Sequence, residues 1–191
     1  MKINILIRTS NRKWLFDRCI KSIEKQTYKN IEVIVSTDRL VNYLPEWVKS
    51  IQVRPDYGHS FYWNLYCNSL KEQVKEGWFF FLDDDDYIES ETAIEEAVKH
   101  LTNENEGVIF QFKRGEVKKP DNEYIKSKTI ERGKIGMPCI FLHYSKKHLA
   151  TFDGKPAADF RFIKEVSTKI NLKFIPLVVV KADRIGNGVC K

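Results

Sequence analysis

Four consecutive aspartates, Asp83 to Asp86, follow the apolar run "WFFFL" at residues 78–82. Adjacent carboxylates repel one another, so this cluster needs a positive partner near neutral pH. On an extended backbone, Asp83 and Asp85 point to the same side, roughly 6–7 Å apart, and Asp84 points elsewhere. Two such carboxylates can flank a hard divalent cation, and oxygen ligands suit magnesium or manganese. The pattern predicts a metal site open to substrate phosphates; a solvated acidic turn, with Asp86 capping the next helix, is the alternative.

The segments that must position these aspartates are strands separated by helices. Residues 3–9, 30–38 and 77–82 are apolar and rich in β-branched or aromatic side chains, which predicts buried strands. Ser10 or Asn11 can cap a helix after the first strand. Further along, we expect a short helix at 44–51, a brief strand at 51–54 and a helix at about 60–75. This alternation predicts an α/β fold with a mixed, mostly parallel central sheet flanked by helices.

Polar side chains follow each of the three long strands. Thr9 ends the first, Asp38 follows the second and the aspartates follow the third. In open α/β sheets, ligands bind beyond the carboxyl ends of the strands. We therefore expect these side chains to share one site, although Thr9 and Asp38 also suit a plain strand end or helix cap.

The second half of the chain has a less regular pattern. We expect helices at 90–102 and 157–170 and strands at 107–113, 139–144 and 173–183, the last bent or ended near Pro176. Residues 114–136 are charged and predict a loop or irregular hairpin, which could cover a ligand as a lid. No interdomain linker is present, so we expect one domain over 1–191, with a nucleotide-binding half at about 1–86 and a catalytic half at about 87–191.

Composition excludes several classes of protein. The net charge of +6 comes from scattered Lys and Arg without a basic block, which argues against nucleic acid as a partner. Cys19, Cys67, Cys139 and Cys190 are far apart and form no metal-thiolate pattern. No run of residues has the length of a transmembrane segment or signal peptide. We expect a cytoplasmic protein with free thiols, and a longer natural polypeptide is an open alternative.

Four segments carry a family resemblance. The opening "INILIRTSNRKWLFDRCIKSIEKQTYKNIEVIVSTD" resembles that of the inverting family 2 glycosyltransferases, which have the GT-A fold. "GWFFFLDDDD" is similar to the strand that ends in the D-x-D signature of that family, and "YGHSFYWN" to its G-x-S-x-A-R-N segment. "GKPAADFRFIKEV" resembles the G-E-D-x-x-F-x-x-R-L segment, with Ala158 in place of the usual Glu. The resemblance covers most of the chain.

The resemblance assigns roles to particular residues. It implies nucleotide-sugar contacts at Thr9, Asp38, Asn64, Asp83 and Asp84. It implies that Asp85, together with Asp83, holds Mn²⁺ or Mg²⁺ against the diphosphate. It implies that Asp159 is the catalytic base that deprotonates the acceptor hydroxyl, although Asp159 also suits the first turn of a helix as a plain charge.

The expected function is a metal-dependent transfer of a sugar from a nucleoside-diphosphate sugar, in particular a UDP-sugar, to a glycan or glycoprotein acceptor, with inversion. A sugar-nucleotide nucleotidyltransferase is one alternative, although "RTSNRKW" lacks the glycine-rich loop of that class. A non-catalytic sugar-nucleotide or glycan-binding module is another, which Ala158 keeps open. Arg184 is a further candidate for diphosphate contact, and the aromatic residues at 61–66 suit either ring stacking or a core.

Overall fold

The computed structural model describes residues 1–183, so Arg184 lies outside the described residues. Four parallel strands form its first part: β1 (Ile3–Thr9), β2 (Ile31–Thr37), β3 (Lys49–Gln52) and β4 (Trp78–Asp83). β1 lies between β2 and β4, with Thr9 opposite Thr37 and Arg8 opposite Asp83. This register aligns the carboxyl ends of the three strands that the sequence predicted.

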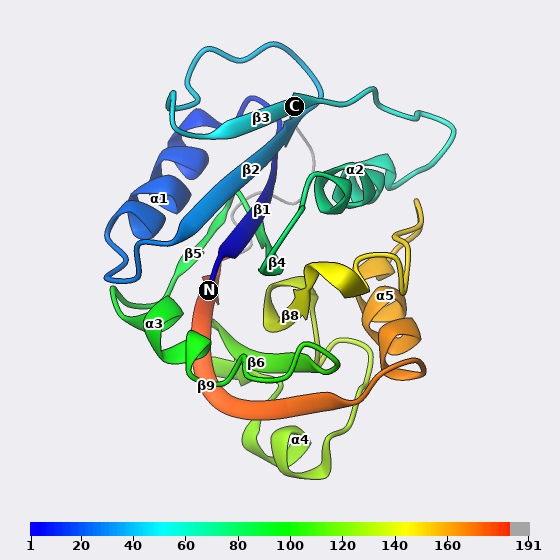
Figure 1. Cartoon of the computed structure of the whole chain (residues 1–191). Coiled ribbons are helices and arrows are strands. Elements are labelled where there is room, and N and C mark those ends of the chain that lie inside the picture. Colours follow the sequence, from blue (N-terminus) through cyan, green and yellow to red (C-terminus); the bar gives the residue numbers. More distant parts are fainter. Residues whose placement is uncertain (184–191) are drawn as a thin grey trace.

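The rest of the chain extends the same sheet. It adds β5 (Asp86–Ile88), β6 (Gly107–Arg114), β7 (Val117–Lys119), β8 (Ile140–His143) and β9 (Leu172–Ala182). The strand order is β3-β2-β1-β4-β8-β6-β9-β5, with β7 paired to β6. β8 is antiparallel to β4 and β6, whereas β9 is parallel to β6. Figure 1 shows that β9 follows a long curve, which brings its end to β5.

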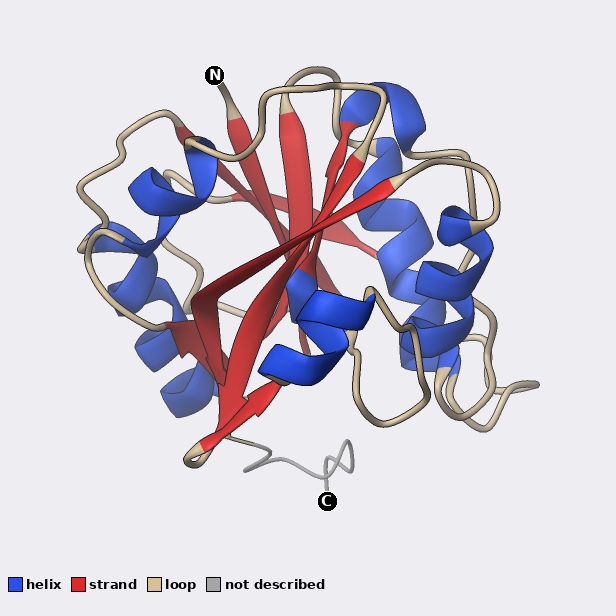
Figure 2. Cartoon of the chain, turned by 90° about the horizontal axis from the view of Figure 1, so that it is seen from below, coloured by secondary structure: helices blue, strands red, loops and turns tan. Residues whose placement is uncertain are grey.

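Helices lie on both sides of the sheet (Figure 2). They are α1 (Lys13–Glu24), α2 (Tyr66–Glu72), α3 (Ala93–Val98), α4 (Asn122–Ser127) and α5 (Ala158–Ser167), with 3-10 turns at Tyr62–Leu65, Met137–Cys139 and Tyr144–Lys146. The buried side of α1 consists of Leu15, Phe16, Cys19, Ile20 and Ile23, as its apolar spacing predicted. Within residues 1–183, none of the helices combines the length and the apolar character that crossing a bilayer requires.

One continuous core joins the parallel and antiparallel parts. Phe80 of β4 stacks on Phe141 of β8 with ring centroids 4.2 Å apart, and Phe110 of β6 meets Phe141 edge-on at 5.0 Å. All three side chains are fully buried. The prediction of a single α/β domain with a mixed, mostly parallel sheet is confirmed.

Two local predictions are wrong. Residues 44–51 form turns and the start of β3 instead of a helix. Pro45 lacks a backbone donor, and its carbonyl accepts a turn hydrogen bond from Val48. Neither Ser10 nor Asn11 caps α1, because the Ser10 hydroxyl donates to Asp38 and Asn11 has a left-handed backbone.

Other segments differ in detail from the prediction. Residues 86–88 form β5, which the sequence analysis did not predict, and segment 114–136 contains β7 and α4. β9 continues through Pro176, where its pairing with β6 shifts register. A proline is tolerated where the ladder is already irregular.

Replacing Phe141 with alanine should destabilise the whole domain, because it removes the ring that joins the two parts of the sheet. A buried Phe→Ala change costs about 3–5 kcal/mol of unfolding free energy. Urea unfolding followed by circular dichroism measures this change. Val117→Ala, at a position 58% exposed, is the control and should change stability little. A loss below about 1 kcal/mol for Phe141→Ala would contradict the described core.

Candidate active site

A cavity of about 580 Å³ opens at the carboxyl ends of β1, β2 and β4. Six of the seven residues assigned from the sequence line it: Thr9, Asp38, Asn64, Asp83, Asp85 and Asp159. The seventh, Asp84, is fully buried and does not line the cavity. Asp83 ends β4, and the next two residues form a turn, so the alternation of side chains along a strand does not continue through the cluster. Asp83 and Asp85 nevertheless line the same cavity, and Asp84 does not.

Asp84 holds the turn beneath the cavity. Its carboxylate accepts a hydrogen bond of 2.7 Å from the Thr9 hydroxyl and is paired with the Arg12 guanidinium. Thr9 also lies 3.2 Å from the Tyr43 hydroxyl. Burial raises the pKa of Asp84 to about 6, while the charge of Arg12 opposes the rise. The geometry of Asp84 is that of a side chain that supports the site from below.

Arg8 links Asp83 to Asn64. Its Nε and Nη2 atoms donate to the two carboxylate oxygens of Asp83 at 2.7 and 3.2 Å. Its Nη1 donates to the Asn64 side-chain oxygen at 2.9 Å. Such a two-bond pair sets the plane of the carboxylate as well as its position. Arg8 therefore supplies part of the positive charge that the aspartate cluster needs.

Asp85 and Asp86 lie in a largely buried acidic turn. Both side chains line the cavity, although each residue is only 6% exposed. Arg12 approaches Asp85 to 3.8 Å. Burial raises the pKa of Asp86 well above its ordinary value, the charges of Asp83 and Asp85 add to this, and the charge of Arg114 opposes it. Added positive charge in the cavity would therefore stabilise the ionised form of the Asp86 carboxyl.

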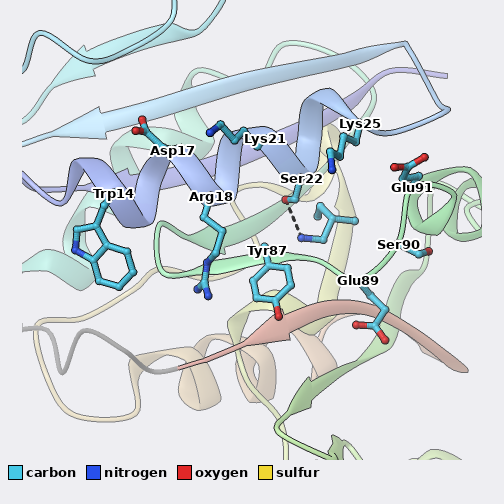
Figure 3. A pocket seen from close by; sticks show the side chains of 11 residues that line it. Trp14, Asp17, Arg18, Lys21, Ser22, Lys25, Tyr87, Glu89, Ser90 and Glu91 are labelled. Atoms are coloured by element: carbon cyan, nitrogen blue, oxygen red, sulfur yellow. Dashed lines mark hydrogen bonds between the residues drawn. The ribbon is translucent and has the colours of Figure 1, made fainter.

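Arg18 projects from α1 beside Tyr87 (Figure 3) and contacts the same acidic turn. It donates to the backbone carbonyl of Asp85 and, at 2.7 Å, to the Asp183 carboxylate. Its guanidinium lies 4.5 Å from the centre of the Tyr87 ring. The groove around Arg18 has a volume of about 600 Å³. Helix α1 contributes both acidic and basic side chains to it, and residues 87–91 contribute acidic ones. Arg18 thereby connects the acidic turn to α1, β5 and the end of β9.

Asp38 marks another part of the cavity. Its two carboxylate oxygens accept hydrogen bonds from the Ser10 hydroxyl at 2.7 Å and the Tyr66 hydroxyl at 3.3 Å. Arg39 approaches the same carboxylate to 3.3 Å. Asp38 is thus held in place while it still lines the cavity.

Asp159 lies in the first turn of α5. The preceding Ala157 has a left-handed backbone, with φ of 57°, and Asp159 accepts a hydrogen bond of 2.8 Å from the Phe160 amide. Burial raises the pKa of the Asp159 carboxyl, the charge of Asp83 adds to the rise, and the charge of Arg8 opposes it. Asp159 and the aspartate cluster therefore line the same cavity and influence each other's charge.

The donor set at the cavity fits a hard divalent cation. Within residues 1–183, no three His, Cys, Asp or Glu side chains are grouped as a complete metal site. Asp83 and Asp85 nevertheless offer carboxylate oxygens to one cavity, which suits magnesium or manganese with the remaining positions filled by phosphate and water. Arg8 donates to both oxygens of Asp83, so a cation at Asp83 would share these oxygens with the guanidinium.

Sequence reasoning missed the three arginines that neutralise the cluster. Arg8, Arg12 and Arg18 contact Asp83, Asp84 and the Asp85 carbonyl respectively. Their signal was present, since three basic residues lie in and after the first strand. The sequence pattern alone does not indicate that β1 pairs with β4.

The fold and site together define an α/β protein with a polar, acidic cavity at its strand ends. The chain belongs to glycosyl transferase family 2, whose family model matches residues 4–151.

One curated relative is a GalNAc(5)-diNAcBac-PP-undecaprenol beta-1,3-glucosyltransferase of Campylobacter jejuni. It is 31% identical over 94 residues, which are 46% of this chain and 30% of the relative.

Two solved structures have a similar fold. One is S. aureus TarS, with a TM-score of 0.73 at 16% identity over 96% of this chain and 37% of TarS. The other is the mannosyltransferase PcManGT from Pyrobaculum calidifontis, in complex with GDP-Man and Mn²⁺, with a TM-score of 0.69 at 15% identity over 98% of this chain and 58% of that one. The chain thus spans less than two thirds of the length of each relative.

Replacing Asp159 with asparagine should stabilise the fold more at high pH than at low pH. Because its pKa is raised in the folded state, the proton on Asp159 favours folding below the unfolded-state pKa, and this contribution is lost as the pH rises through the folded-state pKa. Asparagine stays neutral and avoids that loss. Urea unfolding at pH values of about 4 and about 8, on either side of this window, measures the difference.

The control for this comparison is Glu116→Gln in the exposed β6–β7 turn. An equal effect of Asp159→Asn at both pH values would contradict the raised pKa.

Proposed function

We propose that this protein is a metal-dependent glycosyltransferase. It transfers a hexosyl group from a nucleoside-diphosphate sugar to a hydroxyl of a glycan or glycoconjugate, with inversion at the anomeric carbon. The observation that carries the proposal is the shared cavity, in which Asp38, Asp83 and Asp85 of the strand ends meet Asp159 of α5. Family membership supports the reaction class.

The donor binds along the carboxyl ends of β1, β2 and β4. Thr9 and Asp38 bind the nucleoside, while Asn64 and Asp83, held together by Arg8, bind toward the ribose and diphosphate. The first half of the chain, about 1–86, is thus the nucleotide-binding half, and the remainder carries the base. A UDP-sugar is the favoured donor, supported by the complex of the structural neighbour TarS with UDP-GlcNAc.

Asp85, with Asp83, would hold Mn²⁺ or Mg²⁺. The Mn²⁺ in the GDP-Man complex of PcManGT supports this choice of cofactor. A bound divalent cation supplies Lewis-acid stabilisation of the negative charge on the leaving nucleoside diphosphate. Asp85 and Asp83 would hold this ion, and Arg12 and Arg18 keep the acidic turn in place.

Asp159 is the general base. Its carboxylate takes the proton of the acceptor hydroxyl as the hydroxyl oxygen forms its bond to the anomeric carbon and the bond to the diphosphate breaks. Attack from the face opposite the leaving group inverts the anomeric centre. Among the described residues that line the cavity, Asp38 and Asp159 are the carboxylates outside the aspartate cluster. Asp38 accepts hydrogen bonds from Ser10 and Tyr66 and is assigned to the nucleoside, which leaves Asp159 as the base.

We also propose a cytoplasmic location. Its support is the chemistry of Cys19, Cys67 and Cys139, which are free thiols in the described part of the chain.

Asp85→Ala should abolish metal-dependent donor binding. Loss of a ligand should weaken Mn²⁺-dependent affinity by at least the roughly 10- to 100-fold typical of a supporting residue around a metal. Calorimetric titration of UDP-, GDP- and dTDP-sugars with and without Mn²⁺ tests both the metal requirement and the preference for one nucleotide base. The UDP-sugar should bind most tightly. Glu116→Gln is the matched control and should bind as the wild type does. Unchanged Mn²⁺-dependent binding by Asp85→Ala would refute the metal assignment.

Asp159→Asn should bind the donor normally and lose transfer, because removing a general base reduces the rate roughly 10²- to 10⁴-fold. In the wild type, the rate should fall as the pH drops through the raised pKa of Asp159, since the protonated carboxyl cannot accept a proton. Single-turnover transfer against pH measures this limb, and product anomeric configuration by NMR tests inversion. Normal transfer by Asp159→Asn would show that another group is the base.

A further inference from the structure

Four aromatic side chains form a wall beside the cavity. This aromatic rim consists of Tyr57, Phe61, Tyr62 and Trp63. Tyr57 is 77% exposed and the other three are partly exposed, so the rim is not part of the core. Phe61, Tyr62 and Trp63 line the cavity, whereas Tyr57 lies outside its lining. The rim therefore leads from the cavity toward solvent.

The rings hold one another at steep angles. Tyr62 contacts Tyr57 and Trp63 with ring centroids 5.1 and 5.3 Å apart and interplanar angles of 73° and 74°. Phe61 contacts Trp63 at 5.2 Å. Edge contacts of this kind restrain the rings against one another, which prepares a rigid apolar surface at low entropic cost to a ligand.

Two hydrogen bonds connect the rim and the adjacent Asn64 to the segment that precedes Asp159. The Phe61 amide donates to the Gly154 carbonyl at 3.2 Å, and the Asn64 side chain donates to the Lys155 carbonyl at 3.2 Å. Gly154 packs directly against the ring of His59, where a side chain on residue 154 would collide. The rim and the start of α5 thus form one side of the cavity.

We propose that the aromatic rim is a stacking subsite for the sugar rings of the acceptor glycan, an inference that rests on the proposed function. Sugar rings present apolar C–H faces that pack on aromatic rings, while their hydroxyls stay in contact with water. The rim is joined to the segment before Asp159 and lines the same cavity as Asp159, which suits the molecule whose hydroxyl is deprotonated. The extension past the cavity to Tyr57 suits a chain of sugars that continues into solvent, which a donor of fixed length does not require.

The test measures the binding of triacetylchitotriose and of maltotriose to the intact chain, without donor. Saturation-transfer NMR detects the binding. Wild type should transfer saturation to ring protons of at least one trisaccharide. Tyr62→Ala and Tyr57→Ala should each raise the dissociation constant roughly two- to tenfold, the range expected for one aromatic contact. Tyr57 is so exposed that its replacement should leave the fold intact. Trp47→Ala, at a residue 49% exposed and away from the cavity lining, is the matched control and should bind as wild type.

The same variants are titrated with the UDP-sugar and Mn²⁺. Unchanged donor affinity together with weakened trisaccharide binding supports the subsite. Weakened donor affinity with unchanged trisaccharide binding would assign the rim to the nucleotide and overturn the inference, as would the absence of saturation transfer to both trisaccharides. Trisaccharide binding by a protein that binds no sugar nucleotide would refute the proposed function and leave the subsite standing.

Discussion

The structure depends on the neutralisation of four adjacent carboxylates at the end of β4. Arg8 of β1 pairs with Asp83, and Arg12, just before α1, pairs with Asp84. Arg18 of α1 donates to the backbone carbonyl of Asp85. Partly buried ion pairs of this kind gain little net stability, because desolvation of both charges offsets their attraction. Their main effect is to hold the orientation of the carboxylates, which gives the cavity its shape before any ligand binds.

This arrangement also gives the aspartates different surroundings. Asp84 is fully buried on Thr9 and Arg12, whereas Asp83 and Asp85 line the cavity. Burial raises the pKa values of both Asp84 and Asp86 above that of an ordinary aspartate. A cluster that looks uniform in sequence therefore contains a fully buried member and members that line the cavity.

The sequence predicted the elements whose signal is local. β1, β2 and β4 are continuous apolar runs, and the strand-end rule brought Thr9, Asp38 and the aspartates to one edge. The roles of these residues stay predictions. The arginine partners escaped prediction because Arg8 meets Asp83 only through the pairing of strands 75 residues apart. β5 escaped it as well, since three residues form a strand only because β9 is there to pair with them.

The pairing of β5 with β9 has a consequence for biosynthesis. Asp86 lies opposite Ala182, and Arg18 reaches Asp183 just beyond that strand. A ribosome releases the acidic turn long before it releases β9, so a nascent chain carries these carboxylates without their scaffold. The cavity is therefore completed only after β9 has been synthesised, and premature termination before β9 would yield a chain that has every proposed catalytic side chain but no organised place to use them.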